Sequence, residues 1–137
     1  MLLLIPTHLL YNGSNPWNRV IWPELDKPIT LREIELAIIN GKLVSPAIKY
    51  AHDYDHPEFD RNFHVGKIAW FVVHGYKHPI IVDALEDNFY NIGDGNHRFF
   101  STIIKRDPWT PCWVTGPFER IEKMFLNKGA KSLTLLM

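Results

Sequence analysis

The residues best suited to chemistry lie between positions 91 and 100, in the stretch Asn-Ile-Gly-Asp-Gly-Asn-His-Arg-Phe-Phe. Two glycines, Gly93 and Gly95, allow the backbone to turn sharply and to approach a ligand closely. If a helix begins just after them, its first N–H groups lack intrahelical partners and its dipole attracts an anion. His97 and Arg98 then lie in the first turn, where both side chains can reach that anion. The spacing therefore predicts a phosphate-binding turn.

Each polar residue of this turn has a candidate role. Arg98 can neutralise developing negative charge with a fork of N–H donors. His97 can donate a hydrogen bond to phosphate or transfer a proton. Asp94 can orient His97 or help to hold a magnesium ion. The structural alternative is that Asp94 or Asn96 simply caps the helix.

The elements that position this turn are predicted from periodicity and breakers. Strands are expected at residues 2–5, 47–50, 78–83, 89–92 and 111–115, and helices at residues 30–41, 61–74, 96–105 and 117–129. Thr30 and Glu33 have capping-box spacing. The segments Tyr11–Pro16 and Ala51–Asp60 are predicted to be a turn and a loop, and residues 130–137 an edge strand or a disordered tail. The alternation of helices and strands along the chain predicts an α/β (α+β) fold. We expect one domain spanning residues 1–137, with a small mixed sheet flanked by helices.

Bulk properties exclude several classes of protein. Fifteen basic and fifteen acidic residues balance, which disfavours sequence-independent binding to DNA. Cys112 is the only cysteine, so no internal disulfide can form, and we expect a buried structural thiol in a reducing compartment. The apolar start has no basic region and no apolar run is long enough to span a bilayer, so we expect a cytoplasmic protein with no membrane partner.

The sequence resembles the ParB/sulfiredoxin-like superfamily. The resemblance is carried by Pro79–Asp83, by the Asp-Gly-x-His-Arg motif at Asp94–Arg98, and by Pro111–Val114. Weaker similarity lies at Ile5-Pro6 and at Asn15–Arg19. The good match spans roughly residues 79–115, and the order of the earlier elements also suits the superfamily.

The resemblance implies a nucleotide site. It implies phosphate contacts from the backbone of Gly95, Asn96 and His97 and from the side chains of His97 and Arg98. It also implies a loop over the nucleotide, in which Trp17 stacks on the base and Arg19 touches phosphate. The structural alternative is that Trp17 is buried under a loop and Arg19 lies on the surface. The ligand would be ATP or CTP with Mg²⁺, and the activity would be nucleotide binding, with hydrolysis or phosphoryl transfer as an extension.

The chain departs from the superfamily at three points. Sulfiredoxin carries its catalytic cysteine directly before the His-Arg pair, where this chain has Asn96, so reduction of sulfinic acid is not expected. The DNA-binding and dimerisation modules that follow in ParB proteins are also not expected here. The free-serine kinases of the superfamily require a catalytic carboxylate. In this chain the candidates, by sequence region only, are Glu24, Glu33 and Glu35.

Two other readings stay open. The acidic loop contains His52, Asp55 and His56, with His64 shortly after, and these residues either bind a divalent metal or form a solvated loop. A metal there would favour a metal-dependent nuclease. The other reading is a non-catalytic domain of the same fold that binds a protein or DNA.

Overall fold

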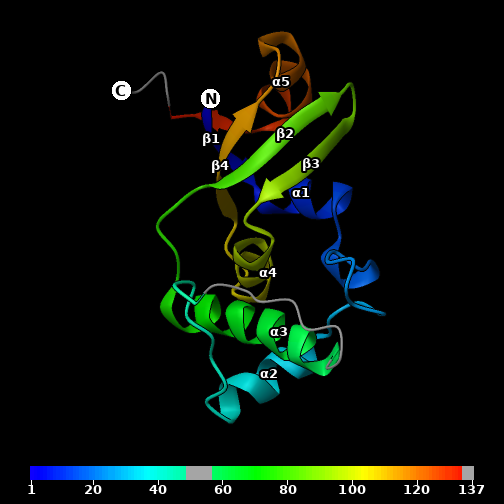
Figure 1. Cartoon of the computed structure of the whole chain (residues 1–137). Coiled ribbons are helices and arrows are strands. Elements are labelled where there is room, and N and C mark those ends of the chain that lie inside the picture. The colour runs from blue at the N-terminus through cyan, green and yellow to red at the C-terminus, as the bar shows by residue number, and fades with distance from the viewer. Residues whose placement is uncertain (49–56, 134–137) are drawn as a thin grey trace. The chain divides into compact units, whose positions relative to one another are not determined.

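The computed structural model describes residues 1–48 and 57–133, and it confirms the predicted α+β fold class (Figure 1). The chain divides into two compact units. The first comprises Met1–Ser14 and Lys77–Met137, and the second comprises Asn15–Tyr76. The glycine turn belongs to the first unit.

The first unit is built on a five-stranded mixed sheet, as predicted. Its strands are β1 (Leu2–Pro6), β2 (Ile80–Glu86), β3 (Phe89–Asp94), β4 (Trp109–Thr115) and β5 (Lys131–Ser132), in the order β3-β2-β4-β1-β5. The pair β2–β4 is parallel and the other pairs are antiparallel. Of the two predictions for the tail, the edge strand is confirmed at Lys131–Ser132, which pairs with β1, and residues 134–137 lie outside the described part.

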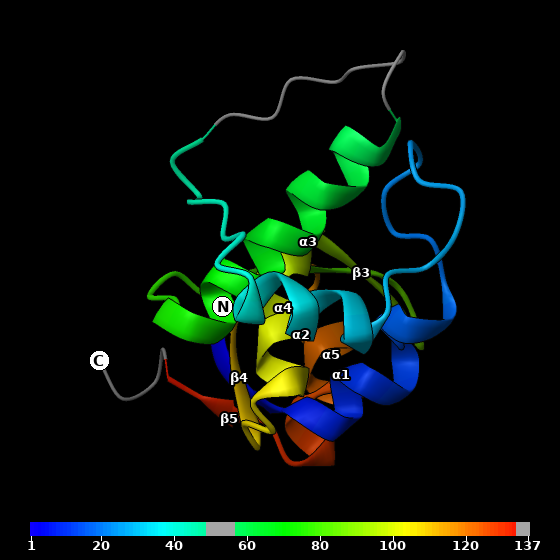
Figure 2. The ribbon, with the colours of Figure 1, turned by 90° about the horizontal axis from the view of Figure 1, so that it is seen from below.

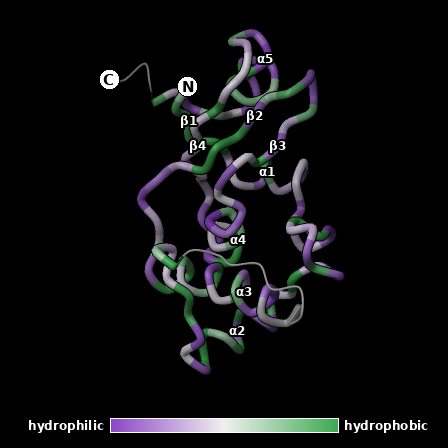
Figure 3. Tube along the Cα trace, in the orientation of Figure 1, coloured by the Kyte–Doolittle hydropathy of each residue, from purple (hydrophilic) through white to green (hydrophobic). Residues whose placement is uncertain are grey.

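Three helices bury the inward side of this sheet: α1 (Thr7–Gly13), α4 (Asn96–Ile104) and α5 (Phe118–Met124). All three contribute to one apolar cluster with alternate residues of the strands. Figure 3 shows that β2 is mostly hydrophobic. Figure 2 shows α1, α4 and α5 gathered beside β4 and β5. The cluster includes Leu3, Ile5, Leu10, Ile80, Val82, Phe99, Cys112, Val114, Ile121 and Phe125.

The second unit holds a 3₁₀ turn, η1 (Pro16–Asn18), and the helices α2 (Leu31–Ile39) and α3 (Pro57–His74), which pack against each other. The capping box predicted for α2 is present, because Thr30 accepts from the Glu33 N–H and Glu33 accepts from the Thr30 N–H. Gly41 follows the end of α2 with φ +66°, as a helix-terminating glycine should.

Three local predictions were wrong. The predicted strand at residues 47–50 is a turn over Pro46–Ile48, tied by the Ile48 N–H to the Ser45 carbonyl at 3.0 Å, and residues 49–50 lie outside the described part. Helix α3 starts at Pro57, inside the predicted loop, because proline is a favourable first helical residue. The sequence analysis also missed α1. Apart from Leu9 and Leu10, its residues are weak helix formers, and burial of Leu10 in the sheet's core decides the local structure.

Among the described residues, no helix has both the length and the apolar character needed to cross a membrane.

Candidate functional site

The turn that leads into α4 begins with a bulge in β3. Ile81 pairs with Asp94 but the next residue, Val82, pairs with Ile92, so Gly93 is the extra residue of the bulge. A Cβ atom on Gly93 would lie only 2.5 Å from Oδ2 of Asp83. The glycine therefore allows the Asp83 carboxylate to sit against the main chain, where it also accepts a 2.6 Å hydrogen bond from the Thr115 hydroxyl.

Gly95 is required by its conformation and by its surroundings. Its φ of +102° lies in the left-handed region, and a Cβ there would meet Cγ2 of Ile80 at 2.7 Å. Gly95 is buried and serves as the N-cap residue of α4. Any larger residue would have to push the helix start away from β2.

The N-cap residue of α4 is Gly95, which has no side chain to cap the helix. The Phe99 N–H donates to the Gly95 carbonyl at 2.8 Å, and the N–H groups of the first turn of a helix are not used by such bonds. No acidic residue occurs in the first turn. The Asp94 carboxylate pairs with Arg98 and the Asn96 amide donates to the Ile92 carbonyl, so the predicted capping role of either residue stays a prediction.

Asn96 is half-buried in the first turn of α4. Its Nδ2 donates a long hydrogen bond of 3.4 Å to the Ile92 carbonyl. Its Oδ1 is buried and has no hydrogen-bond partner among the described residues. Because an unsatisfied buried acceptor costs about 1–3 kcal/mol, a polar ligand atom would stabilise this position.

The guanidinium of Arg98 forms hydrogen bonds with the protein's own main chain. Its Nη1 donates to the carbonyl oxygens of His78 at 2.8 Å and Pro79 at 3.0 Å. Its Nη2 lies 3.3 Å from Oδ2 of Asp94, and the side chain is only 12% exposed. The guanidinium thus fastens the residues before β2 to the turn before α4, and most of its donors are not available to a phosphate.

The other two polar residues of the motif differ in exposure. Asp94 is 71% exposed and forms an ion pair with Arg98. His97 is the second residue of α4 and is half-buried. The structure therefore brings together Gly93, Asp94, Gly95, Asn96, His97 and Arg98 at one strand-to-helix turn, with Arg98 as its brace.

Trp17 and Arg19 belong to the second unit, and each unit is described by itself. The Trp17 N–H donates to Oδ1 of Asn15 at 3.0 Å, which caps η1; Trp17 is half-buried and Arg19 is exposed. Their predicted place over a nucleotide stays a prediction.

The predicted metal ligands His52, Asp55 and His56 lie outside the described residues. Within residues 1–48 and 57–133, no three histidine, cysteine or acidic side chains are grouped to hold a metal ion. The metal-site prediction therefore stays a prediction.

The three candidate catalytic carboxylates each pair with a basic side chain of the second unit. Glu33 accepts from Arg61 at 2.6 Å, and this bond, with the Thr30 bonds, holds the pKa of Glu33 below its usual range despite partial burial. Glu35 lies 3.5 Å from Arg32 on the surface of α2. Glu24 lies 2.7 Å from Nε2 of His64.

The pair of Glu24 and His64 was missed by the sequence analysis. His64 is 3% exposed and stacks on Trp22 with ring centroids 4.1 Å apart. Burial lowers the pKa of His64, while the Glu24 carboxylate acts in the opposite direction. Forty positions separate the two residues, so no local spacing could have identified the pair.

Cys112 is buried in β4, as expected of a structural thiol. Its Sγ donates to the Thr110 carbonyl at 3.4 Å, and burial strongly raises its pKa. A thiol held in the protonated form is a poor nucleophile, which agrees with a packing role.

Comparison of the chain with protein-family models, with curated proteins and with solved structures found no match.

Proposed function

We propose that the turn between β3 and α4 binds the phosphate groups of a nucleoside di- or triphosphate. The observation that carries the proposal is the start of α4. The N-cap residue is a left-handed glycine, which has no capping side chain, and the first turn carries no acid. Such a helix end offers aligned N–H donors to an anion.

The main-chain N–H groups at Asn96 and His97 are the proposed phosphate donors. The His97 side chain adds a hydrogen bond, or moves a proton if hydrolysis or phosphoryl transfer takes place. Oδ1 of Asn96, buried and without a partner in the described part, takes a donor from the ligand or from a metal-bound water. ATP or CTP with Mg²⁺ is the expected ligand, and exposed Asp94 is the proposed carboxylate for the metal.

Arg98 has a positioning role in this proposal. Its bonds to the His78 and Pro79 carbonyls hold the turn against β2, so that the first-turn N–H groups keep a fixed direction. A preorganised turn binds more tightly because less ordering is needed when the ligand arrives. The Asp-Gly-x-His-Arg resemblance supports the same turn as a phosphate site.

A thermal-shift panel tests the proposal. ATP, ADP, CTP and GTP are added with and without magnesium, because a ligand that binds only the folded state raises the melting temperature. We expect at least one nucleotide to stabilise the protein. If none does, nucleotide binding is not the function of this turn.

Two variants then locate the site. His97→Glu puts a carboxylate into the first turn, which favours the helix dipole but repels phosphate. We expect His97→Glu to keep its melting temperature without ligand and to lose the nucleotide-induced shift. His97→Gln keeps a neutral hydrogen-bonding side chain and is the matched control, with most of the shift retained. An equal shift in wild type and His97→Glu would place the nucleotide elsewhere.

A second candidate, a protein-interaction role, is favoured by the aromatic residues of β4. Trp109 and Trp113 alternate with the buried residues of this strand and are 36% and 49% exposed. Lys131 on β5 lies over the Trp109 ring at 4.7 Å. A pull-down that is lost in Trp113→Lys but kept in His97→Glu would favour this role over the nucleotide turn.

A further inference from the structure

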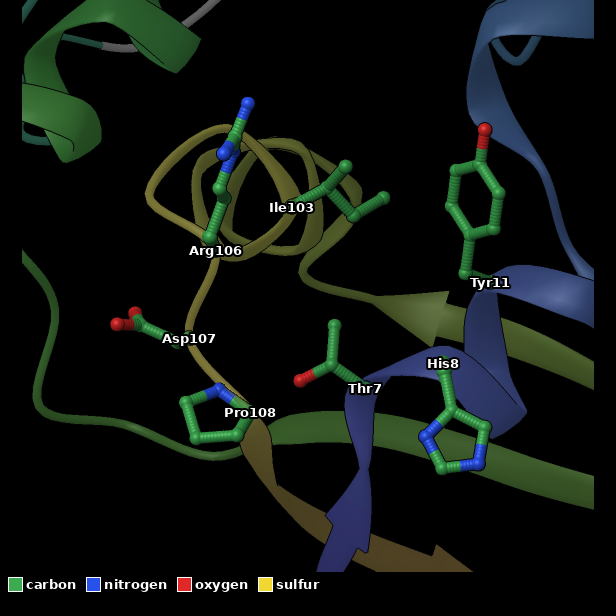
Figure 4. A pocket seen from close by; sticks show the side chains of 7 residues that line it. All are labelled: Thr7, His8, Tyr11, Ile103, Arg106, Asp107 and Pro108. Carbon is green, nitrogen blue, oxygen red and sulfur yellow. The ribbon is translucent and has the colours of Figure 1, made fainter.

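A cavity of about 360 Å³ lies within the first unit, beside the last turn of α4 (Figure 4). Its lining includes Thr7, His8 and Tyr11 from α1, Ile103 from α4, and Arg106 from the connection to β4. The volume lies in the range of small-molecule sites. The nine residues of α4 rise about 13 Å, so this cavity and the glycine turn are separate features at opposite ends of one helix.

Hydrogen bonds hold two of the lining residues in place. The Thr7 N–H donates to the Pro108 carbonyl at 2.9 Å. The Thr7 and Thr110 hydroxyls, both buried, lie 2.8 Å apart. These bonds join the start of α1 to the start of β4, beside the cavity.

Arg106 occupies a position where glycine is usual. It follows the end of α4 with φ +57°, and it closes the helix with N–H bonds of 3.1 Å from Arg106 to Ile103 and from Asp107 to Thr102. A side chain in this left-handed conformation is strained, and such residues gather at functional sites. The guanidinium is exposed at the cavity.

The lining matches a small planar anion. Figure 4 shows the Tyr11 ring and the Arg106 side chain on either side of Ile103, while the Asp107 carboxylate points away from Thr7 and Tyr11. The guanidinium of Arg106 and the phenol hydroxyl of Tyr11 are directed to the same side and can both donate hydrogen bonds, while the imidazole of His8 points the other way (Figure 4). Tyr11 and Ile103 supply flat apolar surface between them.

We propose that this cavity binds an aromatic carboxylate. The ring packs against Tyr11 and Ile103, and the carboxylate is paired with the guanidinium of Arg106, for which a planar carboxylate is the best geometric partner. This site goes beyond the proposed nucleotide turn and does not depend on it.

A titration followed by ¹H–¹⁵N NMR tests the site with three probes. Benzoate carries both the ring and the carboxylate, acetate lacks the ring, and benzylamine carries the opposite charge. We expect saturable shifts for benzoate at the amides of Thr7, His8, Ile103 and Arg106, at least tenfold weaker binding for acetate, and no binding for benzylamine. Equal binding of acetate, binding of benzylamine, or no benzoate shifts at these amides would each overturn the proposal.

Variants at Arg106 separate the ligand contact from the backbone strain. Arg106→Gly removes the guanidinium and the strain together, so benzoate binding should fall at least tenfold while the melting temperature does not fall. Arg106→Gln keeps the strained conformation without the charge and should lose binding equally. Asn88→Gly is the control, because Asn88 also has a positive φ of 64° but does not line this cavity, and it should bind benzoate as wild type does. Unchanged benzoate binding in either Arg106 variant would refute the site.

Discussion

Helices α2 and α4 begin in opposite ways. The start of α2 is closed by its own side chains: Thr30 and Glu33 form a capping box, and Arg61 holds Glu33 in turn. The start of α4 has a left-handed glycine as its N-cap residue, which offers no capping side chain, and carries no acid in its first turn. In both places an arginine also binds two main-chain carbonyls: Arg61 those of Lys27 and Pro28, and Arg98 those of His78 and Pro79.

The two helix starts differ in what they are suited for: the start of α2 stabilises the fold, and the start of α4 is suited to bind an anion. At α2, a carboxylate already neutralises the dipole, so the helix end gains little from another anion. At α4, the arginine fixes the shape of the turn, the first turn carries no acid, and the carboxylate of Asp94, just before the N-cap residue, lies 3.3 Å from Nη2 of Arg98. A helix end that is braced and uncapped is the kind of place where an external anion supplies the missing partner.

The largest expected effect is at Gly95. Gly95→Ala should lower the free energy of unfolding by about 3 kcal/mol, because it combines left-handed strain with a clash at Ile80. Gly41→Ala, after α2, is the matched control: its φ is also positive but a Cβ there meets nothing within 4 Å, so we expect a loss of about 1 kcal/mol. Urea denaturation of both variants measures the difference. Equal losses would show that the contact with Ile80 contributes nothing.

The next effect is at Arg98. Arg98→Met removes the donors to the His78 and Pro79 carbonyls and should lower the free energy of unfolding by about 2 kcal/mol. Arg32→Met is the control, since Arg32 is 70% exposed and pairs with Glu35 on the surface of α2, so its loss should be below about 0.5 kcal/mol. Thermal unfolding at matched pH compares the two. A fully stable Arg98→Met variant would contradict the bracing role.

A smaller loss is expected at the cap of α2. Thr30→Ala removes the acceptor for the Glu33 N–H and should lower the free energy of unfolding by about 1 kcal/mol. Asn96→Ala, at the start of α4, should cost less, because its side chain makes only one long hydrogen bond and leaves its Oδ1 without a partner in the described part. The order of the two melting temperatures checks the contrast between a capped and an uncapped helix start.

The smallest expected effect is a dependence of the free energy of unfolding on pH, through Glu33. The hydrogen bond from Arg61 is the main cause that lowers the pKa of Glu33 from 4.5, so the ionised form stabilises the fold. This contribution is complete above the unfolded pKa near 4.5 and is lost as the pH falls through the lower folded value. Glu33→Gln should therefore show a shallower loss of unfolding free energy below about pH 4.5 than wild type. Parallel acid profiles would contradict the role of this ion pair.

The elements with strong local signals could be predicted from the sequence. The capping box of α2, the strands around the glycine turn and the start of α4 follow from spacing, breakers and periodicity. Helix α1 could not be predicted, because tertiary burial of Leu10 overrides weak local propensity. The bulge at Gly93 also has no local signature beyond the glycine itself.

The location of the candidate site could be predicted from the sequence, but its hydrogen-bond and ion-pair partners could not. The Asp-Gly-x-His-Arg spacing placed the residues on one turn. The sequence could not show that Arg98 binds carbonyls twenty and nineteen positions earlier, or that Glu24 pairs with His64 forty positions later. Such partners are set by the packing of the fold, which local spacing does not encode.

The most direct test of the uncapped helix start is an amide NMR titration with magnesium pyrophosphate, the phosphate part of the proposed ligand without its base. We predict the largest saturable shifts at the amides of Gly95, Asn96 and His97, with the amides of residues 31–33 at the start of α2 unchanged. Shifts of equal size at the two helix starts, or none at residues 95–97, would contradict the account.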